Sequence, residues 1–335
     1  MTGGVATGTL AVPMVPAQDV PRFLHISDTH LWVEGEPPPL VTVVPLRGHD
    51  AGPWAAIWDL VERERPDAIL WTGDVATAQQ VSAYALANRH LAPPAGAPGP
   101  VRAHPSGIPV FCVPGNHDHY AVVGRAVFYL RDRTAYRAVF NDPAPSVHHL
   151  RVRGRDVFVF RLDSSSGIHA GDSLRLATGR IHRDDLAVLD AWSETARAGG
   201  TLAGEEVTPE SLLRSCNVLL MHHDLASKVA FHDLDARSAA RLLKFMASTP
   251  IHLLACGHLH TPDERGYELF GPGRLDARQR GALAKGGRLR AQEVRISRAG
   301  TASQAGAFSQ TVHLVELGDP IRIRRLRYDG ARFAA

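Results

Sequence analysis

The sequence predicts an α/β fold, because short apolar runs rich in strand-forming residues alternate with segments of helical spacing along its 335 residues. A second observation is that five of these runs end in His, Asp or Asn, as strands do at the functional edge of such sheets. Beyond about residue 286, polar and apolar residues alternate with period two, which is typical of further strands. These features suit one large domain, or one domain with a small appendage.

The elements of the first half follow from this pattern in chain order. The first strand is expected in "RFLHISDTHL", after a flexible N-terminal leader over residues 1–20. A helix should begin near Trp54, run through "WAAIWDLVERER" and stop at Pro66. The next predicted elements are the strand "AILWTGD", a helix over "ATAQQVSAYALANRHL", a loop over residues 92–109, the strand "IPVFCVPGNHD" and a helix over "AVVGRAVFYLRDRTAYRAVF".

The second half continues the alternation. A hairpin is predicted over residues 148–163 with its turn near Gly154, followed by a helix in "RDDLAVLDAWSETARA". The strands "NVLLMHHD" and "IHLLACGHLH" flank a helix over "SAARLLKFMAS", and C-terminal strands are expected in "GRLRAQEVRIS", "SQTVHLVEL" and "IRIRRLRYD". We therefore expect residues 21–335 to form a single domain.

Composition narrows the cellular setting and the partners. The formal net charge of +3 is too small to indicate a nucleic-acid or acidic-membrane partner, although Arg dominates over Lys. Cys112, Cys216 and Cys256 each lie in an apolar segment, and three cysteines without regular spacing form no disulfide framework. No secretory signal or membrane-spanning run is evident. We expect a cytoplasmic protein without a membrane partner, and a homo-oligomer is compatible with the sequence.

The polar residues at the ends of the apolar runs indicate a metal site. They occur in "SDTH", "TGD", "GNHD", "MHH" and "GHLH". Carboxylate, amide and imidazole ligands without thiolate suit manganese, iron or zinc, and they argue against a structural zinc site built from cysteines. There are too many ligands for one ion. Two divalent ions that share a bridging carboxylate would suit in-line displacement at phosphorus.

The ordered set of motifs resembles the calcineurin-like metallophosphoesterases. It comprises Asp28-Thr29-His30, Gly73-Asp74, Gly115-Asn116-His117-Asp118, His222 and Gly257-His258-Leu259-His260, and it spans residues 25–260. The resemblance implies a four-layer αββα sandwich, in which two mixed sheets pack together with helices outside. It also implies a hydrolase of phosphate esters, with a small phosphate ester as its partner.

The resemblance also implies a role for each motif residue. One metal would be held by Asp28, His30 and His260, the other by Asn116, His222 and His258, and Asp74 would bridge them. A metal-bridging hydroxide would be the nucleophile. His117 would protonate the leaving oxygen or stabilise charge at phosphorus, and Asp118 would orient it. His223 competes with His222, because neighbours on a strand face opposite sides, and His222 occupies the position that matches the family.

Three further segments favour a phosphodiester as substrate. "RLDSSSG", "GRIHRDDLAVLDAW" and "AGTASQ" resemble segments of bacterial cyclic-nucleotide and glycerophosphodiester phosphodiesterases in this superfamily. The sequence departs from many small-molecule members at "HHDLAS", where Asp224 replaces a proline and places a charge near the substrate mouth, or begins a loop or a helix. His119 is expected to contact phosphate or to be solvated. His169 and His182 are weaker candidates for the pocket wall.

Other functions use the same residues. A phosphomonoesterase or a metal-dependent nuclease would need the same metal core. In a nuclease, the Arg-bearing segment over residues 280–298 would track a phosphate backbone, although it lacks the interleaved aromatic residues of many such surfaces. A non-catalytic scaffold that keeps the fold is a third hypothesis. The complete set of metal ligands argues against it.

Overall fold

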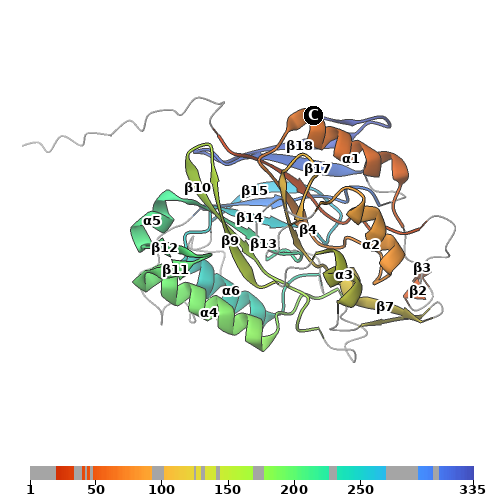
Figure 1. Cartoon of the computed structure of the whole chain (residues 1–335). Helices are drawn as coiled ribbons and strands as arrows, with labels where there is room; N and C mark the ends of the chain where they lie inside the picture. The colour runs from red at the N-terminus through yellow and green to blue at the C-terminus, as the bar shows by residue number, and fades with distance from the viewer. Residues whose placement is uncertain are drawn as a thin grey trace, which may run out of the picture.

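Two mixed β-sheets pack face to face in the computed structural model of the chain, and helices cover both outer faces (Figure 1). The residues described are 20–33, 40–41, 44–45, 48–92, 102–123, 126–129, 133–140, 144–168, 177–225, 232–268, 293–304 and 309–335. This arrangement confirms the predicted α/β class and the four-layer αββα sandwich. The expected leader over residues 1–20 lies almost entirely outside the described residues.

The first sheet joins the two ends of the described chain. Within the described residues its order is β19 (Phe333–Ala334), β18 (Arg322–Tyr328), β17 (Thr311–Glu316), β1 (Arg22–Ile26), β4 (Ala68–Thr72), β6 (Pro109–Val113) and β5 (Arg102–Ala103). Strands β1, β4 and β6 run parallel, whereas β17 is antiparallel to β1. The C-terminal strands, blue in Figure 1, therefore complete the sheet that the N-terminal strand begins.

The second sheet contains the remaining long strands. Its described order is β15 (Asp263–Glu268), β16 (Glu293–Arg298), β14 (Leu253–Cys256), β13 (Cys216–Leu220), β10 (Arg155–Arg161) and β9 (Ser146–Val152). Strands β10, β13, β14 and β16 run parallel to one another, whereas β9 is antiparallel to β10 and β15 is antiparallel to β16. Smaller ribbons are formed by β2 (Leu40–Val41), β3 (Val44–Pro45), β7 (Tyr120–Val123) and β8 (Ala126–Tyr129), and by β11 (Gly200–Leu202) with β12 (Glu205–Val207).

Each sheet has its own set of helices. Helices α1 (Ala51–Glu64), α2 (Val81–Asn88) and α3 (Thr134–Val139) pack on the first sheet, and α4 (Arg183–Ala198), α5 (Pro209–Arg214) and α6 (Ala236–Ser248) pack on the second (Figure 1). Asp50 caps the first turn of α1 by accepting the N–H of Gly52. That helix ends at Glu64, just before the expected stop at Pro66.

The central strands are largely apolar because both of their faces are buried. In β4, Ala68 and Leu70 pack between the sheets, while Ile69 and Trp71 pack against the helices. In the second sheet, Val218 of β13 joins the layer between the sheets and the adjacent Leu219 faces α4 and α6. Period-two alternation thus divides one apolar run between two cores. Polar residues are left for the strand ends.

The sequence-based assignment was wrong in the segment after β6. Residues 121–140 were expected to form one helix, but those of them that the structure describes form most of β7, all of β8 and the short helix α3. Tyr120 pairs with Tyr129 in the antiparallel β7–β8 ribbon. Valine and aromatic residues favour strands over helices, and Gly124 interrupts the run. Helix α2 is also shorter than predicted, and the expected loop over 92–109 contains β5.

The hairpin near Gly154, helix α4 and the C-terminal strands lie where they were expected. Within the described residues, no helix combines the length and apolar character needed to cross a bilayer. The three cysteines are free thiols, of which Cys112 and Cys256 are buried and Cys216 is half-buried.

Candidate dinuclear metal centre

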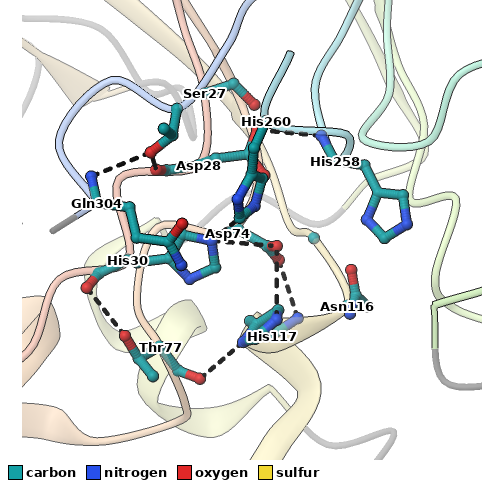
Figure 2. Close-up of polar contacts among 12 residues, drawn as sticks. Ser27, Asp28, His30, Asp74, Thr77, Asn116, His117, His258, His260 and Gln304 are labelled. Carbon is teal, nitrogen blue, oxygen red and sulfur yellow. Dashed lines mark hydrogen bonds and ion pairs between the residues drawn. The ribbon is translucent and has the colours of Figure 1, made fainter. Parts of the chain in front are cut away.

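Five strand ends meet at one edge of the sandwich. Strands β1, β4 and β6 are parallel in the first sheet, and β13 and β14 are parallel in the second, so their carboxyl ends converge. The residues that follow these ends are Asp28 and His30, Asp74, Asn116 and His117, His222, and His258 and His260. Figure 2 shows most of them pointing toward a common centre. The structure brings together all seven predicted metal ligands.

The backbone at these positions adopts an unusual conformation. Positive φ angles occur at Asp28 (52°), His30 (49°), Asp74 (48°), His258 (71°) and His260 (54°). Non-glycine residues rarely occupy this left-handed region, and each such position costs of order 1–3 kcal/mol. The turns after β1, β4 and β14 therefore hold their side chains toward the centre at the expense of local stability.

The first group of side chains contains Asp28, His30, Asp74 and His260, each of which offers a ligand atom within 4.8 Å of the others. The Nε2 atoms of His30 and His260 lie 3.1 Å apart. His260 Nε2 also lies 3.1 Å from Asp28 Oδ1. Asp28 Oδ2 accepts the backbone N–H of His258, which fixes the carboxylate plane.

The second group contains Asp74, His222 and His258, and Asn116 adjoins it. His222 Nε2 lies 3.2 Å from Asp74 Oδ2, from His258 Nδ1 and from Asn116 Oδ1. Its Nδ1 donates to the carbonyl of Thr72, so Nε2 is the nitrogen left to face the centre. Asp74 belongs to both groups, which is the position required of a bridging carboxylate.

These residues fit a pair of divalent cations. The set consists of imidazole nitrogens, carboxylate oxygens and one amide oxygen, which suits first-row divalent ions. Asp28 Oδ1 is fully buried and lies 3.1 Å from the Nε2 atom of His260. A buried carboxylate is costly unless a cation compensates its charge. Bound cations would also explain why ring nitrogens of His30 and His260, and of His222 and His258, lie only 3.1–3.2 Å apart.

Burial and the Asp74 carboxylate govern the pKa values of the imidazoles at this site. Burial alone would lower the pKa of His222, but the adjacent Asp74 carboxylate outweighs it and raises that pKa to about 9. Burial, with the nearby His117, lowers the pKa of His30, and burial, with His223, lowers that of His258. Metal binding at His222 must displace a proton at neutral pH, so metal affinity should increase as the pH approaches 9.

Two motif glycines are required by close contacts. A Cβ atom on Gly115 would lie 2.1 Å from Asp74 Oδ1, and one on Gly257 would lie 2.4 Å from Asp28 Oδ2. Both contacts are far shorter than van der Waals distance. The glycines of "GNHD" and "GHLH" thus let neighbouring loops approach the two carboxylates.

His117 lies beside both groups without joining either. Its backbone N–H donates to Asp74 Oδ1, and its Nδ1 lies 3.0 Å from the carbonyl of Thr77 (Figure 2). Because a carbonyl only accepts hydrogen bonds, Nδ1 carries a proton. The other nitrogen, Nε2, lies 4.0 Å from Asp74 Oδ2, on the side of the centre.

The expected contact between Asp118 and His117 is absent, and that prediction was wrong. The Asp118 carboxylate instead accepts the backbone N–H groups of Val75, Ala76 and Gly115 and the hydroxyl of Tyr84, at 2.6–3.2 Å. It therefore ties the loop after β4 to the loop after β6. Thr77, three residues beyond Asp74, makes the orienting contact with His117 that was assigned to Asp118.

His119 neither reaches the centre nor contacts solvent, so both expectations for this residue were wrong. Its side chain is buried, its ring stacks on Tyr129, and its Nε2 lies 3.2 Å from Asp163 Oδ2. The same oxygen accepts from Arg133 Nη1 at 2.5 Å. Asp163 comes from the "RLDSSSG" segment, so this buried network connects that segment to the turn carrying Asn116 and His117.

We expect Asp163→Asn to lower the free energy of unfolding by about 3 kcal/mol at pH 7, because it leaves a buried guanidinium unpaired. Burial alone would raise the pKa of Asp163, but Arg133 and His119 hold it well below its usual value. A depressed folded-state pKa contributes stability above the unfolded value, about pH 4, that is lost as the pH falls further. Urea unfolding of both proteins without metal should show a difference in the free energy of unfolding that becomes smaller below about pH 4. A difference that stays constant with pH would contradict the charge argument.

Asn116 is oriented by a residue that sequence reasoning did not identify. The side-chain Nδ2 donates to the hydroxyl of Tyr120 at 2.9 Å, which turns Oδ1 toward His222. Tyr120 follows Asn116 by four residues across the short 3₁₀ turn His117–His119. A hydroxyl at that spacing from the motif asparagine is a signal that could have been used.

Tyr120→Phe removes this hydrogen bond and keeps the ring. We expect about tenfold weaker binding of one of two divalent ions, because partners of metal ligands typically contribute that much to affinity. Calorimetric titration of chelator-treated protein with Mn²⁺ should show the change in one binding phase. Tyr328→Phe, on β18, is the matched control, and equal weakening in that variant would contradict the assignment.

Two adjacent histidines, His222 and His223, follow β13, and their side chains point in different directions. His222 faces the centre, whereas His223 Nδ1 lies 2.9 Å from the hydroxyl oxygen of Ser164. The same oxygen accepts the backbone N–H groups of His222 and His223 at 3.2 and 3.1 Å. Ser164 therefore fixes the turn that carries His222. Its only signal in the sequence was the "RLDSSSG" resemblance.

The remaining candidates lie outside the metal groups. Asp224 is buried and accepts from Arg298 Nη1 at 2.6 Å, so its charge is compensated. His182 caps α4, where its Nδ1 accepts the N–H of Asp184. His169 and residues 280–292 of the Arg-bearing segment lie outside the described residues. The "AGTASQ" segment supports the turn after β1, because Thr301 donates to the carbonyl of Asp28 and Ser303 to that of Thr29.

Comparison with known proteins identifies a family and a shared fold. The family model for calcineurin-like phosphoesterases matches residues 21–262. A dimetal phosphatase from Danio rerio shares 12% sequence identity and superposes with a TM-score of 0.53, covering 94% of this chain and 98% of that one. A purple acid phosphatase from yellow lupin shares 11% identity at a TM-score of 0.47, covering 96% of this chain but 54% of that one.

A search of curated protein sequences found no match. The likeness to the Danio rerio enzyme shows a shared fold, whereas the family assignment depends on the sequence match over most of the chain. That match contains every strand end that contributes a side chain to the centre. The chain belongs to the calcineurin-like phosphoesterase family.

Proposed function

We propose that this protein is a dinuclear-metal phosphodiesterase that hydrolyses small phosphodiesters of the cyclic-nucleotide or glycerophosphodiester type. The observation that carries the proposal is the position of Asp74, which lies in both groups of metal-ligating side chains. One ion would be held by Asp28, His30 and His260, the other by Asn116, His222 and His258, with Asp74 between them. Manganese, iron and zinc all suit these ligands.

Bound divalent ions would supply a water of lowered pKa and would stabilise negative charge on the phosphate oxygens. The chain's own residues provide binding, orientation and proton transfer. Asp28 is fixed by the backbone N–H of His258, and Asn116 by Tyr120. His117 is held at Nδ1 by Thr77, and in its imidazolium form it presents a second proton at Nε2. That proton would pass to the departing alkoxide oxygen.

The exposed side of the centre is where a substrate would approach. The side chains of His117 and His260 are 17% and 18% exposed, whereas those of His30 and His222 are fully buried. A phosphoryl group that enters from this side meets His117 before it meets the buried ligands. His117 is therefore suitably placed for the leaving group.

The charge of the centre favours a diester over a monoester. Two divalent cations with the carboxylates of Asp28 and Asp74 carry a formal charge of about +2. One hydroxide and one monoanionic diester balance that charge, whereas a dianionic monoester exceeds it. Imidazoles, rather than Arg or Lys side chains, surround the Asp74 carboxylate. Arg298, at the end of β16, is already paired with Asp224 and Asp263.

The test is hydrolysis of bis(p-nitrophenyl) phosphate and p-nitrophenyl phosphate by chelator-treated protein, with Mn²⁺, Fe²⁺, Zn²⁺ or no metal added back. We expect metal-restored activity that is higher on the diester. Cyclic nucleotides and glycerophosphodiesters would then be screened as natural substrates. Exclusive cleavage of the monoester would overturn the diesterase proposal in favour of a phosphatase.

Two further results would distinguish a nuclease and a scaffold from a phosphodiesterase. Salt-dependent DNA binding with DNA cleavage, and no activity on small diesters, would indicate a nuclease. Two bound ions per chain without cleavage of any of these substrates would indicate a scaffold. The proposal predicts neither result.

A further inference from the structure

A cavity lies at the opposite end of the sandwich from the metal centre. Its volume is about 710 Å³, and Cys216 at the start of β13 and His252 just before β14 form part of its wall. The metal centre follows the carboxyl ends of these same strands. The turn between β17 and β18, over residues 317–321, closes the cavity from the first sheet, so both sheets contribute to it.

We infer that this cavity is a binding site for an organic phosphate of about mononucleotide size. The first reason is its charge: Arg155, Arg214, Arg295 and Arg322 line it, against the single carboxylate of Asp319. Four guanidinium groups in one concave site create a strongly positive potential, which attracts anions. Arginine also binds phosphate through two parallel N–H bonds, which makes it the usual residue for recognising that group.

Two of these arginines, Arg214 and Arg322, differ from those on the adjacent surface. Arg22 and Arg324 pair with Glu64, and Arg153 pairs with Asp67. In the described part of the chain, by contrast, Arg214 and Arg322 form no ion pair; Arg214 has only the electrostatic attraction of Glu210, one helical turn away. Their charge is therefore available to a ligand.

Two further donors are already held in the cavity wall. Arg155 donates from Nη1 to the carbonyl of Leu317 at 3.1 Å, which fixes its guanidinium between the sheets. His252 accepts the backbone N–H of Asn217 at Nδ1, so a neutral His252 carries its proton on Nε2. Burial lowers the pKa of His252 against the opposing pull of Asp319, which favours this neutral form. An uncharged N–H donor thus accompanies the four cations.

The rest of the wall is aliphatic and indicates what the phosphate is attached to. Leu213, Leu317, Pro320, Ile321 and Ile323 line the cavity together with the arginines. Inorganic phosphate would leave these side chains uncovered, whereas a base or another apolar group would bury them. The volume also lies within the range of about 300–1,000 Å³ that is typical of small-molecule sites. The phosphate of such a ligand would bind the arginines, and its organic part would cover the aliphatic side chains.

The test uses trinitrophenyl-AMP, an aromatic nucleotide whose fluorescence increases in apolar surroundings. It is titrated into chelator-treated full-length protein, so that no metal at the other site can hold the phosphate. The double variant Arg214→Glu/Arg322→Glu reverses two exposed charges at the cavity, and Arg327→Glu makes the same change elsewhere on β18. We expect at least about tenfold weaker probe binding in the double variant and less than about a twofold change in Arg327→Glu.

Equal probe affinity in the wild type and the double variant, or equal loss in Arg327→Glu, would overturn the inference. Circular dichroism and melting temperature establish that the variants are folded; if the double variant is not, Arg322→Ala with the same titration replaces it. AMP should displace the probe and adenosine should not, and equal displacement by adenosine would overturn the phosphate assignment. The inference does not depend on the proposed hydrolysis, because the double variant should retain wild-type hydrolysis at the metal centre.

Discussion

Asp74→Ala should abolish hydrolysis and reduce the metal content to fewer than about one ion per chain. The reason is geometric, because Asp74 lies in both groups of metal-ligating side chains while every other ligand lies in one. Its Oδ2 lies 3.2 Å from His222 Nε2 and 3.8 Å from His30 Nε2. Elemental analysis of purified protein after dialysis against Mn²⁺ measures the metal content, and the chromogenic diester measures turnover.

A variant of another predicted ligand and a control variant test whether the loss of both ions is specific to Asp74. Asn116→Ala should weaken binding of one ion and leave the group of Asp28, His30 and His260 intact, and it should also abolish turnover. His149→Ala, a histidine substitution on β9 away from the centre, is the matched control and should retain both ions. If Asp74→Ala kept two tightly bound ions, the bridging assignment would be wrong.

His117→Ala should keep both metals and lose about 10²–10⁴-fold in turnover, which is the usual contribution of a positioned general acid or base. The side chain lies beside the centre and is held by Thr77, and its Nε2 is 4.0 Å from Asp74 Oδ2. Its removal therefore takes away a proton donor without removing a metal ligand. Metal content and turnover, measured as for Asp74, separate these two roles.

The leaving group provides a further check on His117. A p-nitrophenolate departs without protonation far more easily than an alkoxide. The loss in His117→Ala should therefore be larger for an alkyl phosphodiester than for the p-nitrophenyl diester. Equal losses on both substrates would assign His117 to charge stabilisation at phosphorus, and full activity on both would falsify any catalytic role.

Much of the metal centre could be predicted because its ligands follow apolar strands directly. A buried strand is recognisable from its composition, and parallel strands place their carboxyl ends at one edge whatever their separation in the sequence. Asp28 and His258 are far apart in the chain, yet both follow such strands, and the structure joins Asp28 Oδ2 to His258 N at 3.0 Å. The motif glycines belong to the same local pattern.

The residues that support the centre were harder to predict because their partners are distant in sequence. Asp118 and His119 are consecutive, yet Asp118 bonds to the loop after β4 and His119 to Asp163. Nothing local to "GNHDHY" distinguishes a carboxylate that holds two loops from one that orients a neighbouring imidazole. The error at residues 121–140 has a similar origin, since the pairing of β7 with β8 outweighs a helical spacing of apolar residues.

The sequence by itself predicted the α/β class, the long strands of both sheets, the seven candidate metal ligands and their family, because these depend on periodicity and on short motifs at strand ends. Only the tertiary structure decided that Thr77 contacts His117, that Ser164 fixes the turn carrying His222, and that arginines from both sheets line a cavity at the opposite end of the sandwich. Side-chain direction and long-range contacts are fixed when the two sheets pack together. No single segment of the chain contains that information.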